Sequence, residues 1–276
     1  MFLREYIYNE LQDVYPPEEL KSLAKIISKE ILQLSELDCY TGKYADLLTD
    51  KRDLLRNAIQ RLRQFEPLQY IQGLAPFCGW LFCVAPGVLI PRPETEELAA
   101  LIIKESSADS RILDIGTGSG CIAITLSKNI PGAVVEGWDV SEKALKIARR
   151  NNEELQANVS FCLVDILNDG IENKTFDIIV SNPPYITEKE KADMHPNVLN
   201  WEPDLALFVP DNDPLLFYRR IAKVGKNMLS PKGRLYFEIN QYYSQETAQM
   251  LEDFGYKDIR IVKDLFENDR IITATL

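Results

Sequence analysis

The stretch that decides the fold is Arg111–Gly120, which reads RILDIGTGSG. A short segment typical of a buried strand is followed directly by a loop with glycine at every second position. Glycine permits a sharp turn and a close approach of the backbone to a ligand, and a helix after such a loop presents free N–H groups. The next apolar segment, Val134–Trp138, ends at Asp139, whose carboxylate can accept hydrogen bonds from both hydroxyls of a ribose. The pattern predicts a nucleotide-binding βαβ unit, and its structural alternative is a tight turn without a ligand.

The spacing of the glycines narrows the choice of ligand. Nicotinamide-binding loops follow G-x-G-x-x-G, whereas this loop follows G-x-G-x-G and resembles the first motif of class I methyltransferases. In those enzymes the loop packs against the amino-acid part of S-adenosylmethionine. The resemblance assigns the following residues to the cofactor: Asp114, Gly116, Thr117, Gly118, Ser119 and Gly120. Asp114 can instead cap the loop. The third strand ends at Asp165, which either reaches the adenine amino group or is a solvated strand-end acid.

Strands and helices alternate after this loop. The expected strands are Arg111–Ile115, Val134–Trp138, Val159–Val164, Phe176–Ser181, Arg234–Ile239, Ile259–Val262 and Arg270–Ala274. The expected helices are Gly120–Ser127, Ser141–Leu155, Pro214–Met228 and Ser244–Phe254. The alternation predicts an α/β fold with a mostly parallel sheet and helices on both faces. Because the connection Asp264–Asp269 is too short for a crossover helix, the final strand should run antiparallel.

The chain before residue 98 has a different texture. Residues 1–74 carry apolar residues at helical spacing, and one helix is expected to begin near Thr49 and to end before Pro67. Residues 75–97 combine β-forming residues with prolines and glycines, which is typical of a hairpin and a linker. We therefore expect a small helical bundle in 1–74, a β-hairpin and linker in 75–97, and an α/β domain in 98–276.

The fourth predicted strand ends in the tetrapeptide Asn182-Pro183-Pro184-Tyr185. It falls at the carboxyl edge of the sheet, where open α/β folds bind ligands. The prolines stiffen the segment and remove two backbone donors. The Asn182 side-chain oxygen and the Pro183 carbonyl can each accept one proton of an –NH₂ group, and Tyr185 can stack on a flat amide or ring. This predicts catalysis at a planar nitrogen, with Asn182 also beside the cofactor. The structural alternative is a rigid turn.

Composition argues against several other classes of protein. The 276 residues are 46% hydrophobic and 26% charged, which suits about two globular domains. A charged start and the lack of a long apolar run predict a cytoplasmic protein without a membrane segment. Five scattered cysteines and one histidine, His195, fit no zinc pattern, so we expect no metal and mostly buried, reduced thiols. The net charge of -11 disfavours direct nucleic-acid binding.

The motifs together closely resemble those of the release-factor glutamine methyltransferases, the HemK/PrmC family. The decisive stretch is Gly87–Glu96, which reads GVLIPRPETE. Further matches are Pro67–Gly73, Trp201–Pro203, Ala206–Leu207 and Asp269–Arg270, so the likeness is collinear over essentially the whole chain. One departure is Glu238-Ile239-Asn240, where the family usually has Glu-Ile-Gly. Asparagine tolerates unusual backbone angles, so we expect the geometry rather than the chemistry to differ there.

The resemblance implies a class I S-adenosylmethionine-dependent methyltransferase with a Rossmann-like, seven-stranded sheet. It implies that S-adenosylmethionine is the cofactor, S-adenosylhomocysteine the product, and the substrate the glutamine N5 of the Gly-Gly-Gln motif in class I peptide chain release factors. The helical domain would help to recognise that partner. Arg92 and Glu94 would lie near the cofactor and peptide channel, or else form an ion pair that fixes the linker. Glu202 would shape the substrate mouth or cap a turn.

Three other functions compete with this interpretation. The first is glutamine methylation of a ribosomal protein. The second is methylation of adenine N6 in a nucleic acid, since amino-directed methyltransferases share Asn-Pro-Pro-aromatic motifs; the acidic charge disfavours it. The third is a non-enzymatic adaptor, which the intact loop Gly116–Gly120 and the intact segment Asn182–Tyr185 disfavour.

Overall fold

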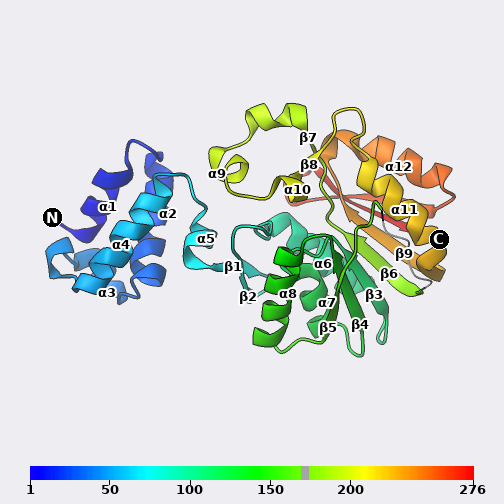
Figure 1. The fold of residues 1–276 in the computed structure, drawn as a ribbon, viewed down its shortest axis with the longest axis horizontal. Helices are drawn as coiled ribbons and strands as arrows, with labels where there is room; N and C mark the ends of the chain where they lie inside the picture. The colour runs from blue at the N-terminus through cyan, green and yellow to red at the C-terminus, as the bar shows by residue number, and fades with distance from the viewer. Residues whose placement is uncertain (169–173) are drawn as a thin grey trace. The chain divides into compact units, whose positions relative to one another are not determined.

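The computed structural model describes residues 1–168 and 174–276, and it divides into two compact units (Figure 1). The first unit comprises Met1–Gly73 and His195–Trp201, and the second comprises Leu74–Met194 and Glu202–Leu276. The segment His195–Trp201, which the sequence placed within the α/β domain, therefore clusters with the helical unit. Within the described residues, no helix combines the length and the apolar character needed to cross a lipid bilayer.

The first unit is a helical bundle. Its elements are α1 (Leu3–Leu11), α2 (Pro17–Ile26), η1 (Ile27–Ile31), α3 (Glu36–Thr41), η2 (Tyr44–Asp46), α4 (Thr49–Leu62), α5 (Leu68–Gln72) and α9 (Pro196–Leu199). Pro17 stands in the first turn of α2, where its missing N–H costs nothing, and the Ser35 hydroxyl caps α3. One face of α1, α2, η1 and α4 forms the core, with Ile7, Ile27 and Leu55 each 0% exposed. The start of α4 at Thr49 confirms the prediction, whereas α3 and the short turns were not predicted.

The segment around α9 is held to the first unit by aromatic residues. The Trp201 Nε1–H donates a hydrogen bond to the Gln64 carbonyl at 3.0 Å. The His195 ring meets the Phe65 ring edge-on, with 5.9 Å between the ring centroids. These contacts join residues far apart in the sequence, which explains why no local pattern predicted them.

The second unit contains the seven-stranded sheet. Its helices are α6 (Pro93–Glu105), α7 (Cys121–Asn129), α8 (Glu142–Glu154), α10 (Asp204–Leu207), α11 (Leu216–Met228) and α12 (Ser244–Asp253), with 3-10 turns η3 (Glu188–Asp193) and η4 (Gln241–Tyr243). Its main strands are β3 (Arg111–Ile115), β4 (Val134–Asp139), β5 (Val159–Leu163), β6 (Phe176–Ser181), β9 (Leu229–Glu238), β10 (Lys257–Lys263) and β11 (Asp269–Thr275). Two small sheets pair β1 (Leu74–Phe77) with β2 (Trp80–Cys83), and β7 (Ile186–Thr187) with β8 (Phe208–Val209).

The sheet has the order β10-β11-β9-β6-β3-β4-β5. The neighbours from β5 to β9 are parallel, and β11 is antiparallel to both β9 and β10, which confirms the prediction for the final strand. The β1–β2 hairpin confirms the hairpin expected in 75–97.

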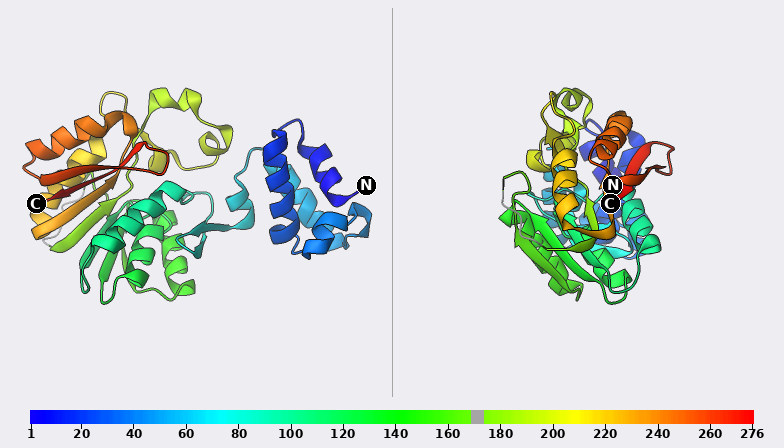
Figure 2. Two further views of the ribbon diagram at one scale, coloured as in Figure 1. Left: turned by 180° about the vertical axis from the view of Figure 1, so that it is seen from behind. Right: turned by 90° about the vertical axis from the view of Figure 1, so that its right-hand side faces the viewer.

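Helices cover both faces of the sheet, as predicted (Figures 1 and 2). On one face, α6 and α7 bury residues such as Leu98 and Ile122 against Ile112 and Ile178. On the other face, α11 and α12 pack onto alternate residues of the same strands, such as Leu113 and Ile179. A strand buried on both faces must be apolar throughout, which is why β3 and β6 read as continuous apolar runs.

The strand order reverses between β3 and β6. From β3 the chain adds β4 and β5 on one side and then returns to place β6 on the other. The two strands pair in parallel up to Ile115 and Ser181, and the Ser181 hydroxyl donates to the Ile115 carbonyl at 2.6 Å. Ligands in open α/β sheets bind beyond the carboxyl ends of the strands at such a point.

Candidate active site

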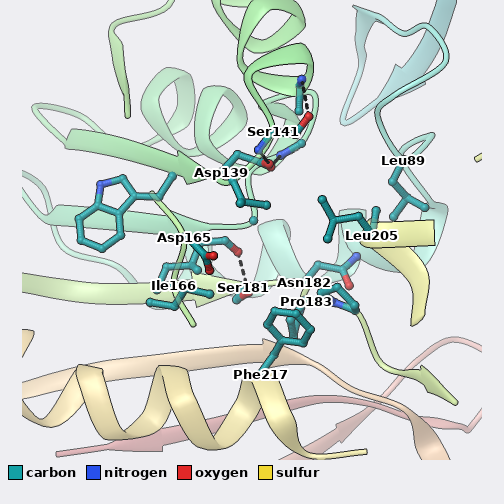
Figure 3. A pocket seen from close by; sticks show the side chains of 18 of the residues that line it. Leu89, Asp139, Ser141, Asp165, Ile166, Ser181, Asn182, Pro183, Leu205 and Phe217 are labelled. Carbon is teal, nitrogen blue, oxygen red and sulfur yellow. Dashed lines mark hydrogen bonds between the residues drawn. The ribbon is translucent and has the colours of Figure 1, made fainter. Parts of the chain in front are cut away.

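A cavity of about 210 Å³ opens at this switch point in the second unit (Figure 3). Three successive strand ends contribute to its wall, with Asp139 as the last residue of β4, Asp165 after β5 and Asn182 after β6. The glycine loop after β3 contributes Gly116 and Gly118. The structure thus brings together the main motifs that the sequence predicted.

The glycine loop is built on left-handed backbone conformations. Gly116, Gly118 and Gly120 have φ angles of 75°, 56° and 81°. A Cβ added to Gly118 would meet no atom within 4 Å, so this stretch of backbone is open. A Cβ added to Gly120 would lie 3.1 Å from side-chain atoms of Ile124 and Phe161, so Gly120 serves close packing.

Asp114 lies beneath the loop rather than on the cavity wall. Its side chain is 0% exposed, and its Oδ2 accepts hydrogen bonds from the Thr117 hydroxyl at 2.7 Å and the Ala123 N–H at 3.2 Å. Burial raises the pKa of Asp114 to about 7. Its Oδ1 has no hydrogen-bond partner within the described residues. These contacts favour the alternative in which Asp114 fixes the loop.

Thr117 and Ser119 also point away from the cavity. They are 4% and 2% exposed, and neither lines it. The Ser119 carbonyl accepts a hydrogen bond from Asn151 Nδ2 at 2.9 Å. Of the loop residues predicted to touch a cofactor, Gly116 and Gly118 are therefore the ones that the structure places on the cavity wall.

Asp139 lies at the end of β4, where the sequence predicted a carboxylate that binds the ribose hydroxyls. Its Oδ2 accepts from the Gly118 N–H at 2.9 Å and its Oδ1 from the Ser141 N–H at 2.8 Å. Each oxygen keeps a second lone pair for a ligand hydroxyl. Burial raises the pKa of Asp139, while the two backbone N–H groups favour its charged form. Asp139 therefore joins the glycine loop to the end of β4 as well as lining the cavity.

Asp165 lines the cavity and also organises its own turn. Its Oδ1 accepts from the Leu167 N–H at 2.9 Å and its Oδ2 from Asn168 Nδ2 at 2.8 Å. The hydrogen bond from Asn168 holds the pKa of Asp165 below its usual value. The carboxylate is therefore anchored at the cavity edge.

The tetrapeptide divides between the cavity and the protein interior. Asn182, Pro183 and Pro184 line the cavity. Asn182 Nδ2 donates to the Thr95 hydroxyl oxygen at 3.2 Å. Tyr185 does not line the cavity; its hydroxyl donates to Glu238 Oε1 at 3.1 Å, and burial raises the pKa of Tyr185. Its hydroxyl is therefore a donor at all ordinary pH values.

Arg92 forms an ion pair with Glu202 rather than with Glu94, the partner that the sequence suggested. Arg92 Nη2 lies 2.5 Å from Glu202 Oε1, and Glu202 Oε2 accepts from the Ile90 N–H at 3.1 Å. Both contacts tie the linker to the segment before α10. Glu94 lies in the first turn of α6, and neither it, Arg92 nor Glu202 lines the cavity. The ion pair expected to fix the linker thus exists, but its acid is Glu202.

Asn240 corrects one prediction. Its φ and ψ are -70° and 124°, which any residue adopts, so the expectation of unusual backbone geometry is wrong. The difference is chemical, because Asn240 Nδ2 donates to the Tyr185 carbonyl at 3.1 Å and its Oδ1 accepts from the Tyr242 N–H at 3.0 Å. A glycine could make neither contact. Asn240 therefore holds the end of the tetrapeptide.

Sequence reasoning missed the apolar part of the wall. It includes Leu89, Val140, Ile166, Leu167, Leu205 and Phe217. These residues come from five separate segments, and no shared sequence pattern links them. Only their place next to the strand-end motifs could have indicated a role.

The cavity suits S-adenosylmethionine, whose parts are an amino acid, a ribose and a flat adenine. It offers open glycine backbone at Gly118, a carboxylate at Asp139 and an apolar wall. Among residues 1–168 and 174–276, no group of three acidic, histidine or cysteine side chains is arranged to hold a metal ion. The five cysteines are free thiols, and burial raises the pKa of Cys121 to about 12.

This fold and this site define a class I S-adenosylmethionine-dependent methyltransferase. Residues 94–200 match the family described as Methyltransferase small domain. The chain is 58% identical to a release factor glutamine methyltransferase of Bacteroides thetaiotaomicron, over 98% of this chain and 97% of that protein. It is 46% identical to one of Flavobacterium psychrophilum, over 95% and 94%. The chain belongs to the release factor glutamine methyltransferase family.

A solved structure is also similar. A methyltransferase from Pyrococcus furiosus matches with a TM-score of 0.53 and 18% identity, covering 70% of this chain and 87% of that one. At this identity the likeness concerns the fold alone. It agrees with the predicted fold class, and the relatives confirm the resemblance drawn from the motifs.

Proposed function

We propose that this enzyme methylates the N5 side-chain nitrogen of the glutamine in the Gly-Gly-Gln motif of class I peptide chain release factors. The observation that carries the proposal is that the glycine loop and the tetrapeptide Asn182–Tyr185 meet at one cavity, which Asn182, Pro183 and Pro184 line directly. The names of the relatives support a release factor as the substrate and do not favour a ribosomal protein or a nucleic acid.

We assign the cofactor to the strand-end residues. Gly116 and Gly118 would receive the amino-acid part of S-adenosylmethionine, Asp139 the ribose hydroxyls, and Asp165 the adenine amino group. Asp114, Thr117, Ser119 and Gly120 would act indirectly, because they hold the loop from beneath. Bound S-adenosylmethionine supplies an electrophilic methyl group, and the protein supplies orientation and electrostatics.

The tetrapeptide would orient the substrate amide. Asn182 Oδ1 and the Pro183 carbonyl would each accept one N–H of the glutamine side chain. Both bonds draw the hydrogens towards the protein and turn the nitrogen lone pair out of conjugation and towards the methyl donor. Because these acceptors are fixed before the substrate arrives, they need no reorganisation during the reaction. Tyr185, which does not line the cavity, would instead hold the tetrapeptide from behind through the hydrogen bond from its hydroxyl to Glu238.

The remaining predicted residues would act on the substrate through the linker. The Arg92–Glu202 ion pair holds the linker Gly87–Ile90 beside the cavity, and Gly87, Val88 and Leu89 line it. We propose that this pair shapes the entrance for the peptide, with Glu94 nearby, and that the helical unit recognises the release factor as a whole.

Mass spectrometry of a purified release factor tests the proposal. Incubation with the enzyme and S-adenosylmethionine should add 14 Da, about one methyl group, to the Gly-Gly-Gln peptide. A release factor whose motif glutamine is replaced by asparagine is the matched control and should stay unmodified. Ribosomal proteins and an adenine-containing oligonucleotide should gain no methyl group. Methylation of either in preference to the release factor would overturn the assignment.

A further inference from the structure

Behind the tetrapeptide lies a chain of hydrogen bonds that ends on a buried carboxylate. Glu238, at the end of β9, is 1% exposed. Its Oε2 accepts from the Thr95 hydroxyl at 2.6 Å, and its Oε1 accepts from the Tyr185 hydroxyl at 3.1 Å. The Thr95 oxygen in turn accepts from Asn182 Nδ2 at 3.2 Å. The chain of bonds thus joins β9 and the start of α6 to two members of the tetrapeptide.

The number of protons gives this chain of bonds a direction. A threonine hydroxyl carries one proton, and a carboxylate carries none. The proton of Thr95 is therefore committed to Glu238, and the Thr95 oxygen can only accept from Asn182. An asparagine amide has one donating and one accepting end, so only its –NH₂ end can face Thr95. Its Oδ1 is then left for the cavity.

The surroundings of Asn182 agree with this direction. Within the described residues, its Oδ1 takes part in no hydrogen bond and is not among the buried unpartnered atoms, so it stays accessible. Asn182 also lines the cavity. A reversed amide would instead present –NH₂ to the substrate –NH₂, donor against donor.

We propose that Glu238, acting through Thr95, is a positioning residue that determines which end of the Asn182 amide faces the substrate. Its second bond fixes the Tyr185 ring in the same way. This inference rests on the proposed function, because it concerns how the substrate amide is recognised. It explains why a carboxylate is kept in the interior at this place.

The surroundings of Glu238 act on its charge in both directions. Burial raises the pKa of Glu238 above its usual value, and the hydrogen bonds from Thr95 and Tyr185 and the positive charge of Arg270 offset part of this effect. An uncharged residue at this position would lose the direction of the hydrogen bonds. Glutamine, for example, has only one accepting end for two donors.

The test is the turnover rate of Thr95→Val, which keeps the shape of the side chain and removes the hydroxyl. We expect kcat to fall roughly 10–100-fold, as when a reacting group is misplaced, with the affinity for S-adenosylmethionine within about twofold of the wild-type value. Thr95→Ser restores the hydroxyl and should recover most of the rate. Thr247→Val is a matched control, since Thr247 in α12 is 0% exposed and donates to the carbonyl of Tyr243, the residue that precedes this helix. Its kcat should stay at the wild-type level.

A double-mutant cycle separates positioning from general destabilisation. If Thr95 acts only through Asn182, adding Thr95→Val to Asn182→Ala should lower kcat by less than about twofold beyond Asn182→Ala alone. Glu238→Gln serves if Thr95→Val does not fold; because Glu238 also accepts from the Tyr185 hydroxyl, it is compared in the background Asn182→Ala with Tyr185→Phe, where it should lower kcat by less than about twofold. Independent losses that multiply, or a wild-type kcat in Thr95→Val, would overturn the inference. Full activity of Asn182→Ala would instead overturn the proposed catalytic role, so the two failures are distinguishable.

Discussion

Replacing Asp114 by asparagine should change how the free energy of unfolding depends on pH. Asp114 is 0% exposed, and burial raises its pKa from 3.8 to about 7. Between these values the folded protein keeps a proton on Asp114 that the unfolded chain has already released. The stability contribution of this group is therefore fully present below pH 3.8 and is lost as the pH rises through about 7.

The magnitude follows from the size of the shift. One pKa unit corresponds to about 1.4 kcal/mol, so a shift of roughly three units, from 3.8 to about 7, corresponds to about 4 kcal/mol. Asparagine cannot ionise and lacks this dependence. Because Asp139 interacts electrostatically with Asp114, the difference between their unfolding free energies reports on Asp114 together with its coupling to Asp139. That difference should shift in favour of Asp114→Asn as the pH rises.

Urea unfolding without ligand, followed by far-UV circular dichroism between pH 4.5 and 8, measures this difference. A control is Thr125→Val, because Thr125 is also 0% exposed but carries no charge. Its stability should follow the wild-type curve in parallel. If the curves of Asp114→Asn and wild type differ by a constant over the whole range, the buried carboxylate titrates normally and the reasoning about its environment fails.

Four further outcomes follow from the structure. Asn182→Ala should lower kcat by roughly 10²–10³ with little change in S-adenosylmethionine affinity. Asn182→Asp should be impaired less because it keeps an acceptor. A near wild-type rate in the alanine variant would mean that the tetrapeptide is only a turn. Asp139→Ala should weaken S-adenosylmethionine binding by about 1–3 kcal/mol in calorimetry, where tighter binding of NAD by the wild type would contradict the cofactor assignment. A chain that starts at Leu74 should still bind S-adenosylmethionine if circular dichroism shows that it is folded, but it should lose most of its activity on intact release factor. A full rate of methylation would show that the helical unit is not a recognition module. Gly137→Ala should lower the free energy of unfolding by about 1–3 kcal/mol, because the new Cβ would lie 2.7 Å from the Phe161 ring. An unchanged melting temperature would mean that the ring can move away freely.

Local signals explain what the sequence could predict. The strands β3 and β6 are short apolar runs, and the elements after them carry glycines or prolines whose backbone preferences are intrinsic. The carboxyl ends of parallel strands share one edge of a sheet, so Asp139, Asp165 and Asn182 were expected to meet there. The antiparallel final strand followed from a short connection. Its insertion between β9 and β10 did not, because strand order depends on contacts between distant segments.

The support behind the site could not be predicted in this way. Thr95 and Glu238 are 143 residues apart in the chain and meet only in the folded protein. In the sequence, Glu238 is simply an acidic residue at the end of an apolar strand. The loop presents the opposite difficulty: the glycine spacing indicates a ligand, yet it does not reveal that Thr117 and Ser119 turn inward while Gly118 stays open.

Two walls of the cavity share one principle of construction. At the end of β3, the buried carboxylate of Asp114 accepts a hydrogen bond from the Thr117 hydroxyl and so holds the glycine loop. At the end of β9, the buried carboxylate of Glu238 accepts a hydrogen bond from the Thr95 hydroxyl and so holds Asn182. Burial raises the pKa of both acids, which means that each charge disfavours the folded state. In its ionised form, which Asp114 adopts above about pH 7, a carboxylate only accepts, and it therefore fixes the orientation of every donor around it. An apolar residue of similar size would stabilise the fold but would leave the loop and the amide free to turn. The two buried acids thus lower stability in exchange for a binding site that is rigid before its ligands arrive.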